Sequence, residues 1–188
     1  MAFSITEFKS NLKQGGARPS LFKVDLFFPS TVVQPPTKSE FLVRSSSIPA
    51  STIGSHDIFF HGKPIRLAGD RNYDTWETVI INDEDFGIRH SIESWMEMIS
   101  NPHLNTRDKD FGNGEGENVL YKKDLFVRQF GKSGKQVRSY KFRNAFPVSV
   151  SPINLDWNSS EIEEFTCTWT YDFWQPISDT SSSQPNIP

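Results

Sequence analysis

The residue types that most often carry chemistry are few and scattered in this chain. The four histidines form no cluster with metal-ligand spacing; they are His56, His61, His90 and His103. In a strand region, alternation turns His56 and His61 to opposite faces. The single cysteine, Cys167, lies in an alternating apolar strand and is interpreted as a buried small apolar side chain. One cysteine can form neither an intrachain disulfide nor a multi-cysteine zinc site.

Two loop motifs resemble ligand sites but lack essential parts. The glycine-rich segment 112–116 follows no strand and opens no helix, so it is interpreted as a loop and not as a phosphate cradle. Asp108 and Asp110 begin like a calcium loop, but Gly112 replaces the third oxygen ligand and Val119 replaces the bidentate glutamate. No nucleophile elbow, HExxH or P-loop sequence occurs. We therefore predict a protein that is not an enzyme and that uses no metal and no cofactor.

The charge distribution is more informative than any motif. The 188 residues carry a net charge of −3, which argues against a generally basic nucleic-acid-binding protein. Nevertheless, residues 119–143 hold eight basic side chains and one acidic one, Asp124, whereas 83–85 and 161–164 are acidic. Three interpretations remain open: an ordinary solvated face, a nucleic-acid contact, or head-to-tail pairing of the basic patch with the acidic patch of another copy.

The elements that must position these residues are mostly strands. Alternation predicts strands at 20–29, 39–46, 53–68, 73–82, 119–130, 135–143, 146–157 and 161–174. Helices are expected at 4–14, where Ser4 and Glu7 form a capping box, and at 84–100, where apolar residues recur with helical spacing and Asn82 or Asp83 can cap the start. Because the strands do not alternate with helices, the expected fold class is mainly β, with two packed antiparallel sheets (a sandwich or barrel) and one flanking helix.

Composition along the chain suggests three parts. We expect an N-terminal helical arm at 1–16, a β domain at 17–174 and a disordered Ser/Pro-rich tail at 175–188. No apolar run is long enough for a membrane-spanning helix. The core is predicted from the inward positions of these elements, and comprises Phe22, Val24, Leu26, Trp76, Ile80, Ile92, Trp95, Leu155, Phe165, Trp169 and Tyr171.

Several segments, in order and with similar spacing over residues 17–174, point to a known family. They are 17–24 (ARPSLFKV), 68–76 (AGDRNYDTW), 81–84 (INDE), 121–123 (YKK), 127–130 (VRQF), 146–147 (FP), 155–157 (LDW) and 171–174 (YDFW). In these segments the chain resembles the tail tube proteins of T4-like contractile-tailed bacteriophages. The segments 29–38 and 101–118 look longer than the usual form of this family.

The resemblance implies both an assembly and a set of partners. Subunits of this family form hexameric rings whose strands join into a continuous inner β-barrel, and the rings stack into a tube inside a contractile sheath, through which DNA is delivered into the host. The implied partners are further copies of the chain, the tail sheath protein, the baseplate hub or initiator and the tape measure protein, and genomic DNA would pass without sequence-specific binding. The implied location is the virion, after assembly in the host cytoplasm.

Candidate interface residues lie in segments too polar, too basic or too thinly apolar for a core. Residues 44–60 are expected to extend from the body toward a neighbouring subunit or ring, and the N-terminal helix is a second candidate contact. The candidates are Phe8, Leu12, Arg44, Ser46, Ile48, Pro49, Ile53, His56, Ile58, Lys122, Arg128, Arg138, Lys141, Glu161 and Glu163. The inner surface of such a tube, its bore, must not bind DNA tightly. Most basic side chains of 119–143 are therefore expected outside the bore or paired with acids between subunits.

Two alternatives to a tube subunit remain at this point. A baseplate tube-initiator, or the tube protein of another contractile injection system, would share the fold. A β-sandwich module that binds glycans or nucleic acid would instead use exposed aromatic side chains and the basic hairpin.

Overall fold

The computed structural model describes residues 5–12, 16–35, 39–102, 106–107 and 121–177. Its helices are α1 (Ile5–Asn11), α2 (Ser39–Leu42) and α3 (Gly87–Ile99). Its strands are β1 (Phe22–Asp25), β2 (Val43–Ser46), β3 (Ser51–Phe60), β4 (Lys63–Tyr73), β5 (Trp76–Ile81), β6 (Ser100–Asn101), β7 (Thr106–Arg107), β8 (Lys123–Phe130), β9 (Gln136–Val150), β10 (Glu164–Thr170) and β11 (Phe173–Ile177). All recorded strand pairings are antiparallel, which confirms the mainly β fold class.

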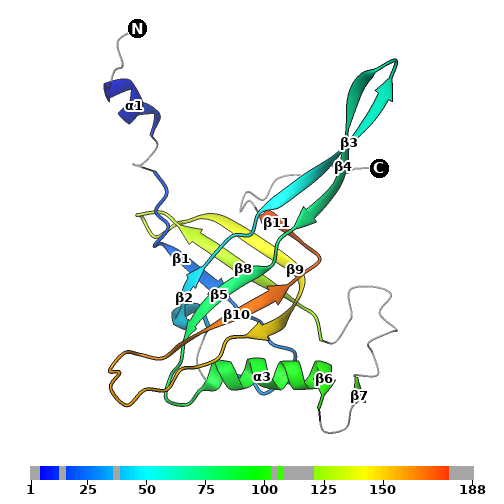
Figure 1. Cartoon of the computed structure of the whole chain (residues 1–188). Coiled ribbons are helices and arrows are strands. Elements are labelled where there is room, and N and C mark those ends of the chain that lie inside the picture. Colours follow the sequence, from blue (N-terminus) through cyan, green and yellow to red (C-terminus); the bar gives the residue numbers. More distant parts are fainter. Residues whose placement is uncertain (1–4, 13–15, 36–38, 103–105, 108–120, 178–188) are drawn as a thin grey trace.

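The long strand β9 joins two layers of the body (Figure 1). Its first part pairs with β8 and β11, and β8 also pairs with β1; these strands form layer 1. Its last part pairs with β10, which pairs with β5 and through it with β2; these strands form layer 2. On the other side, the Leu26 N–H, just after β1, donates to Ser39 Oγ at the start of α2 (3.0 Å), so α2 holds the two layers together there.

The space between the layers is filled by the predicted core. Trp76, Ile80 and Trp169 are fully buried, as are most other predicted core residues, and Phe22 is half-buried against them. Leu155 is a wrong prediction, because its side chain is 85% exposed. The strand expected at 146–157 ends at Val150, before Pro152, and proline cannot donate to a strand ladder.

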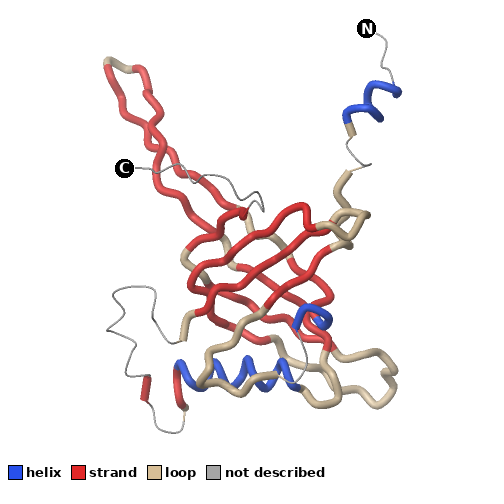
Figure 2. Tube along the Cα trace, turned by 180° about the vertical axis from the view of Figure 1, so that it is seen from behind, coloured by secondary structure: helices blue, strands red, loops and turns tan. Residues whose placement is uncertain are grey.

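Helix α3 lies across one end of the two layers (Figures 1 and 2). Its buried stripe includes Ile88, Ile92 and Trp95, as the helical spacing predicts, and the Trp95 Nε1–H donates to the Tyr121 carbonyl (2.7 Å). The helix begins after Phe86, which has a left-handed backbone (φ 51°), and the Gly87 N–H donates to Asp83 Oδ1 (3.1 Å). No helix among the described residues is long and apolar enough to cross a membrane.

Several element boundaries differ from expectation. The segment expected as a strand from 39 opens as α2, and the strand expected over 20–29 is regular only as β1. The strands expected at 135–143 and 146–157 are one strand, β9, which runs through Asn144 in a left-handed conformation (φ 55°). The strand expected over 161–174 is divided into β10 and β11, and Asn144 Nδ2 donates to Asp172 Oδ2 (2.6 Å) where the chain passes between layers. Strand β11 continues through Ile177, because its pairing with β9 extends that far.

Some expectations fall outside the described residues. These include the glycine-rich segment 112–116, the calcium-like start at Asp108 and Asp110, most of the loop 101–118, His103, and the tail from residue 178.

Candidate assembly surfaces

Strands β3 and β4 form a hairpin that projects from the body (Figure 1). They pair with each other and, among the described strands, with no other. Every residue from Thr52 to Ala68 is exposed, including the large apolar side chains Ile58, Phe59 and Phe60. A turn at His61 and Gly62, both with positive φ, divides the segment expected as a strand over 53–68 between the two strands of the hairpin. A two-stranded hairpin with this much exposed apolar surface is only marginally stable alone, so its surface is one that a neighbour would cover.

The two faces of this hairpin differ. Ile58 pairs with Ile65, and His56 pairs with Leu67, so these four side chains share one face, which we call the apolar hairpin face. On the opposite face, Asp57 pairs with Arg66, and Arg66 Nε lies 3.7 Å from Asp57 Oδ1.

Two glycines lie close together at the base of the hairpin. The register shifts between Ile53 and Ser55, which places Gly54 beside Asp70. A Cβ added at Gly69 would lie 3.0 Å from the His56 ring and 3.2 Å from the Gly54 carbonyl carbon, whereas a Cβ added at Gly54 would have no neighbour closer than 3.6 Å. A side chain at position 69 would therefore displace the His56 ring or the adjacent backbone, whereas one at position 54 would meet only ordinary contacts.

Layer 1 ends in two strand edges, β1 and β11, that pair with only one strand each among the described residues. The Phe130 N–H donates to the Leu21 carbonyl (2.9 Å), and hydrogen-bonded pairs alternate along antiparallel strands. By this alternation, the backbone groups pointing away from layer 1 belong to Phe22 and Val24 on β1, and to Trp174 and Pro176 on β11. Since proline has no N–H, the β11 edge offers fewer donors than the β1 edge.

The face of layer 1 that points away from the core is charged but largely balanced. Arg128 Nη2 lies 2.8 Å from Asp25 Oδ2, and Lys141 Nζ lies 2.6 Å from Asp124 Oδ2. Lys122 similarly lies 3.3 Å from Asp172. These basic side chains are therefore paired with acids of their own chain, and not left free to pair only with a neighbouring subunit.

Two carboxylates on this face, Asp124 and Asp25, have pKa shifts of opposite direction. Burial acts to raise the pKa of Asp124, but hydrogen bonds from Lys141 and the Asn144 N–H, with the charges of Lys141 and Arg143, outweigh it and hold the pKa below its usual range. For Asp25, burial dominates and raises the pKa, because Glu40 opposes the attraction of Arg128 and Lys23.

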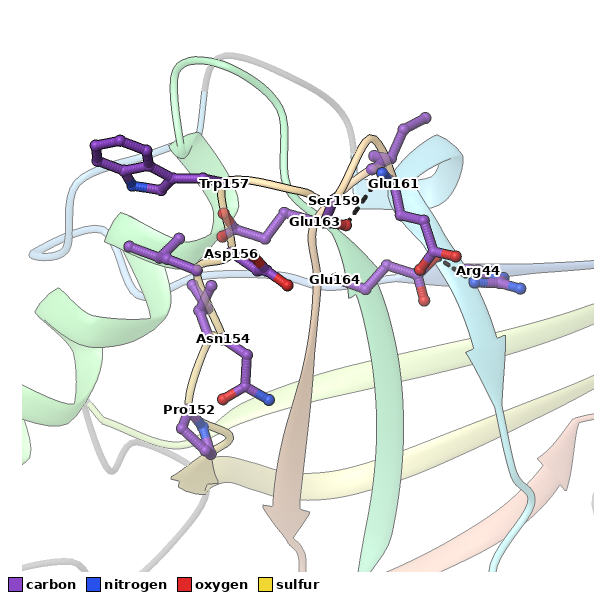
Figure 3. Close-up of a pocket in the computed structure, with 12 residues that line it drawn as sticks. Arg44, Pro152, Asn154, Asp156, Trp157, Ser159, Glu161, Glu163 and Glu164 are labelled. Atoms are coloured by element: carbon purple, nitrogen blue, oxygen red, sulfur yellow. Dashed lines mark hydrogen bonds and ion pairs between the residues drawn. The ribbon is translucent and has the colours of Figure 1, made fainter.

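A third surface is the loop between β9 and β10, shown in Figure 3. It lines a cavity of about 750 Å³ that contains four acidic side chains and one basic one; they are Asp156, Glu161, Glu163, Glu164 and Arg44. Arg44 pairs with Glu164, and Asn82 Nδ2 donates to Glu163. Trp157 is fully exposed, and Leu155 and Ile162 are largely exposed. This loop, residues 152–163, is called the acidic loop below.

The interface residues predicted from the sequence do not form one site. Phe8 on α1 and Leu12 just after it are exposed, and α1 lies apart from the body in Figure 2. Ile53 belongs to the hairpin with His56 and Ile58.

The predicted extension begins later than expected. Arg44 and Ser46 lie in β2 of layer 2, where Ser46 Oγ accepts from Trp76 Nε1 (3.0 Å), and Pro49 is buried. The projecting part therefore starts at β3 and not at residue 44. The role of these residues as interface contacts stays a prediction.

The sequence-based prediction overlooked part of each surface. Phe59, Phe60, Ile65 and Leu67 were not named, although the alternation of Ile65 and Leu67 with Arg66 could have identified these two. Trp157 gave no such signal, because its exposure depends on where β9 ends. Cys167, in contrast, is buried as expected, and burial raises the pKa of its thiol.

Comparison with known proteins places this fold in a family. A model of the family described as "Phage tail tube protein" matches residues 17–176. The tail tube protein gp19 of Enterobacteria phage T4 is 27% identical over 165 residues, covering 85% of this chain and 91% of that protein. The chain therefore belongs to the phage tail tube protein family, and it is a structural subunit of a phage tail tube.

Solved structures share the fold. A chain of the tube-terminating cap of the anti-feeding prophage gives a TM-score of 0.63 at 18% identity, with 88% of this chain and 93% of that chain covered. A chain of the sheath–tube complex of an extracellular contractile injection system in its extended state gives a TM-score of 0.55 at 14% identity, with 94% and 99% covered.

Proposed function

We propose that copies of this chain close into hexameric rings and that the rings stack into a tail tube that conducts DNA into the host. The observation that carries the proposal is the pair of open edges of layer 1. Pairing of β1 of one subunit with β11 of the next would remove both edges at once and make a continuous barrel. A contact between two different edges is heterologous, and such contacts close into rings when the rotation allows.

In this arrangement layer 1 surrounds the bore and layer 2 lies outside it. The bore would then carry the balanced ion pairs Arg128–Asp25 and Lys141–Asp124. A surface with little net positive charge binds phosphate groups weakly, so DNA could move along it. Arg128 and Lys141 would thus lie in the bore and be paired within the subunit, whereas the sequence had suggested that most basic side chains lie outside the bore or pair between subunits.

The hairpin would supply a second contact. Its apolar face has no partner within the described part of the chain, and it projects beyond the body, where it can reach a neighbouring subunit or ring. Helix α1, with Phe8 exposed on it and Leu12 exposed just after it, would supply a third contact. The tail sheath protein, the tape measure protein and the baseplate hub or initiator are the other proposed partners, and assembly would take place in the host cytoplasm before incorporation into the virion.

The experiment is to purify the full chain and examine it by negative-stain electron microscopy and sedimentation over a range of concentrations. Six-fold rings and stacked tubes support the proposal. Single rings that never elongate would point instead to a tube-initiator role, and a monomer at every concentration and salt would contradict ring formation.

A further inference from the structure

We infer that the acidic loop of one subunit receives the basic turn between β8 and β9 of the subunit stacked on it. This inference rests on the proposed function and names the partner of one of its surfaces. The basic turn comprises residues 131–138, which include Lys132, Lys135 and Arg138 and no acidic residue.

The basic turn is closed by backbone hydrogen bonds and carries three charges without ion-pair partners among the described residues. The Gly131 N–H donates to the Lys135 carbonyl, and the Gly134 N–H donates to the Gly131 carbonyl, both at 2.9 Å. Lys132, Lys135 and Arg138 are exposed, and none of them has an ion-pair partner among the described residues. This distinguishes them from Arg128 and Lys141, which are paired on the face of layer 1.

The acidic loop has the chemistry to bind such a group. The side chains of Asp156 and Glu163 lie toward the space that the loop encloses, and Trp157 extends from its rim (Figure 3). Carboxylates next to an exposed indole can hold a lysine or arginine by ion pairing and by a cation–π contact together. The Asn82 N–H donates to the Glu163 carbonyl (2.9 Å), which brings the acidic segment 83–85 to the same place and adds to the negative charge.

The two surfaces lie at opposite ends of the body. Figures 1 and 2 place the turn after β8 at the end from which α1 and the hairpin project, and the acidic loop at the end covered by α3. They therefore cannot meet within one copy. A contact between opposite ends of identical copies repeats along one direction, which is the geometry of a stack. The open edges of layer 1 close the ring, and the paired ends then join one ring to the next.

Charge reversal tests this inference in the full chain. One variant carries Lys132→Glu and Lys135→Glu, a second carries Asp156→Lys and Glu161→Lys, and a third carries all four changes. Glu97→Lys is the matched control, because Glu97 is an exposed acid on α3 at the same end as the acidic loop. Rings and tubes are counted by electron microscopy as the protein concentration is varied.

Each reversal alone should leave rings intact and raise the concentration needed for stacking by about tenfold or more, because a weak exposed ion pair is lost at every subunit of the ring. The variant with all four substitutions should restore stacking, and Glu97→Lys should have no effect. Unchanged stacking in the first two variants, or no restoration in the third, would overturn the inference, and would mean that the acidic loop binds another protein or only solvent. Failure of the proposed function would look different, because the unmodified chain would then form no rings.

Discussion

The indole of Trp76 on β5 lies flat against the ring of Phe142 on β9, with centroids 4.2 Å apart and planes inclined by 8°. Trp76 belongs to layer 2 and Phe142 to layer 1, so this stack joins the two layers at their centre. Both side chains are fully buried. The stability of the subunit therefore depends on this contact far more than on the projecting part of the hairpin, residues 52–68, which is exposed throughout.

The first prediction concerns this stack. Phe142→Ala should lower the free energy of unfolding by about 3–5 kcal/mol, since it removes a large buried ring and leaves a cavity between the layers. Urea denaturation followed by tryptophan fluorescence measures the change. Phe59→Ala is the control: Phe59 is 71% exposed on the hairpin, and its removal should change unfolding by less than about 0.5 kcal/mol. Equal effects of the two variants would show that the core is not where we place it.

The second prediction separates assembly from folding. Ile58→Asp places a charge on the apolar hairpin face and should abolish tube formation while the urea midpoint of the subunit stays unchanged, because the hairpin is outside the core. Ser55→Asp introduces the same charge in the same strand but beside Ala68 on the other face. Tubes should still form with Ser55→Asp. If Ile58→Asp protein assembles as well as the unmodified chain, the apolar hairpin face is not a contact.

The third prediction concerns the shape of the hairpin at its base. Gly69→Ala should impair assembly, because the new methyl group would press on the His56 ring at 3.0 Å and change the path of the hairpin. Gly54→Ala adds the same methyl group with ordinary spacing, 3.6 Å from the nearest atom, and should assemble normally. Adding His56→Ala to Gly69→Ala should recover part of the lost assembly, as counted by electron microscopy. Equal behaviour of the two alanine variants would argue against the close packing at position 69.

The fourth prediction follows from the lowered pKa of Asp124. A carboxylate with a lowered folded-state pKa stabilises the fold above its unfolded pKa, about 3.9, and this contribution is lost as the pH falls through the folded-state value. Asp124→Asn should therefore be less stable than the unmodified chain at pH 7, and the difference should shrink as the pH falls below about 4. Urea midpoints measured across this range give the comparison.

Asp25→Asn is the control, because Asp25 lies on the same face and its pKa is shifted in the opposite direction. Because burial raises the pKa of Asp25, ionising it in the folded state is unfavourable, and the unmodified chain loses stability as the pH rises through that pKa. The stability of Asp25→Asn relative to the unmodified chain should thus improve as the pH rises. If the stability of the two variants relative to the unmodified chain changed with pH in the same way, the directions of the two pKa shifts would be contradicted.

The sequence was sufficient for features that depend on local periodicity. The helical spacing of Ile88, Ile92 and Trp95 predicted the buried face of α3, and alternation predicted the two strands of the β8–β9 hairpin. The boundaries of β9 could not be predicted, because the run from Asn144 onward looks like the start of a new strand. Only the bonds of Asn144 to Asp124 and Asp172, which lie far away in sequence, show why the strand continues there.

The candidate surfaces were predictable only in part. Alternation indicated an extended segment with Ile58, but the register that places Ile65 and Leu67 on the same face is set by the turn at His61 and Gly62. Similarly, the sequence showed eight basic residues in one stretch, but not that Lys141 and Arg128 are paired across strands whereas Lys132 and Lys135 are not. These distinctions are set by strand pairing and not by composition.

The most direct test of the central claim is a cryo-electron-microscopy map of the assembled full chain at a resolution that shows strand pairing. We predict six-fold rings in which the outward backbone groups of Phe22 and Val24 on β1 face Trp174 on β11 of the adjacent subunit. A ring in which these two edges lie apart, or a protein that stays monomeric at every concentration, would contradict the account.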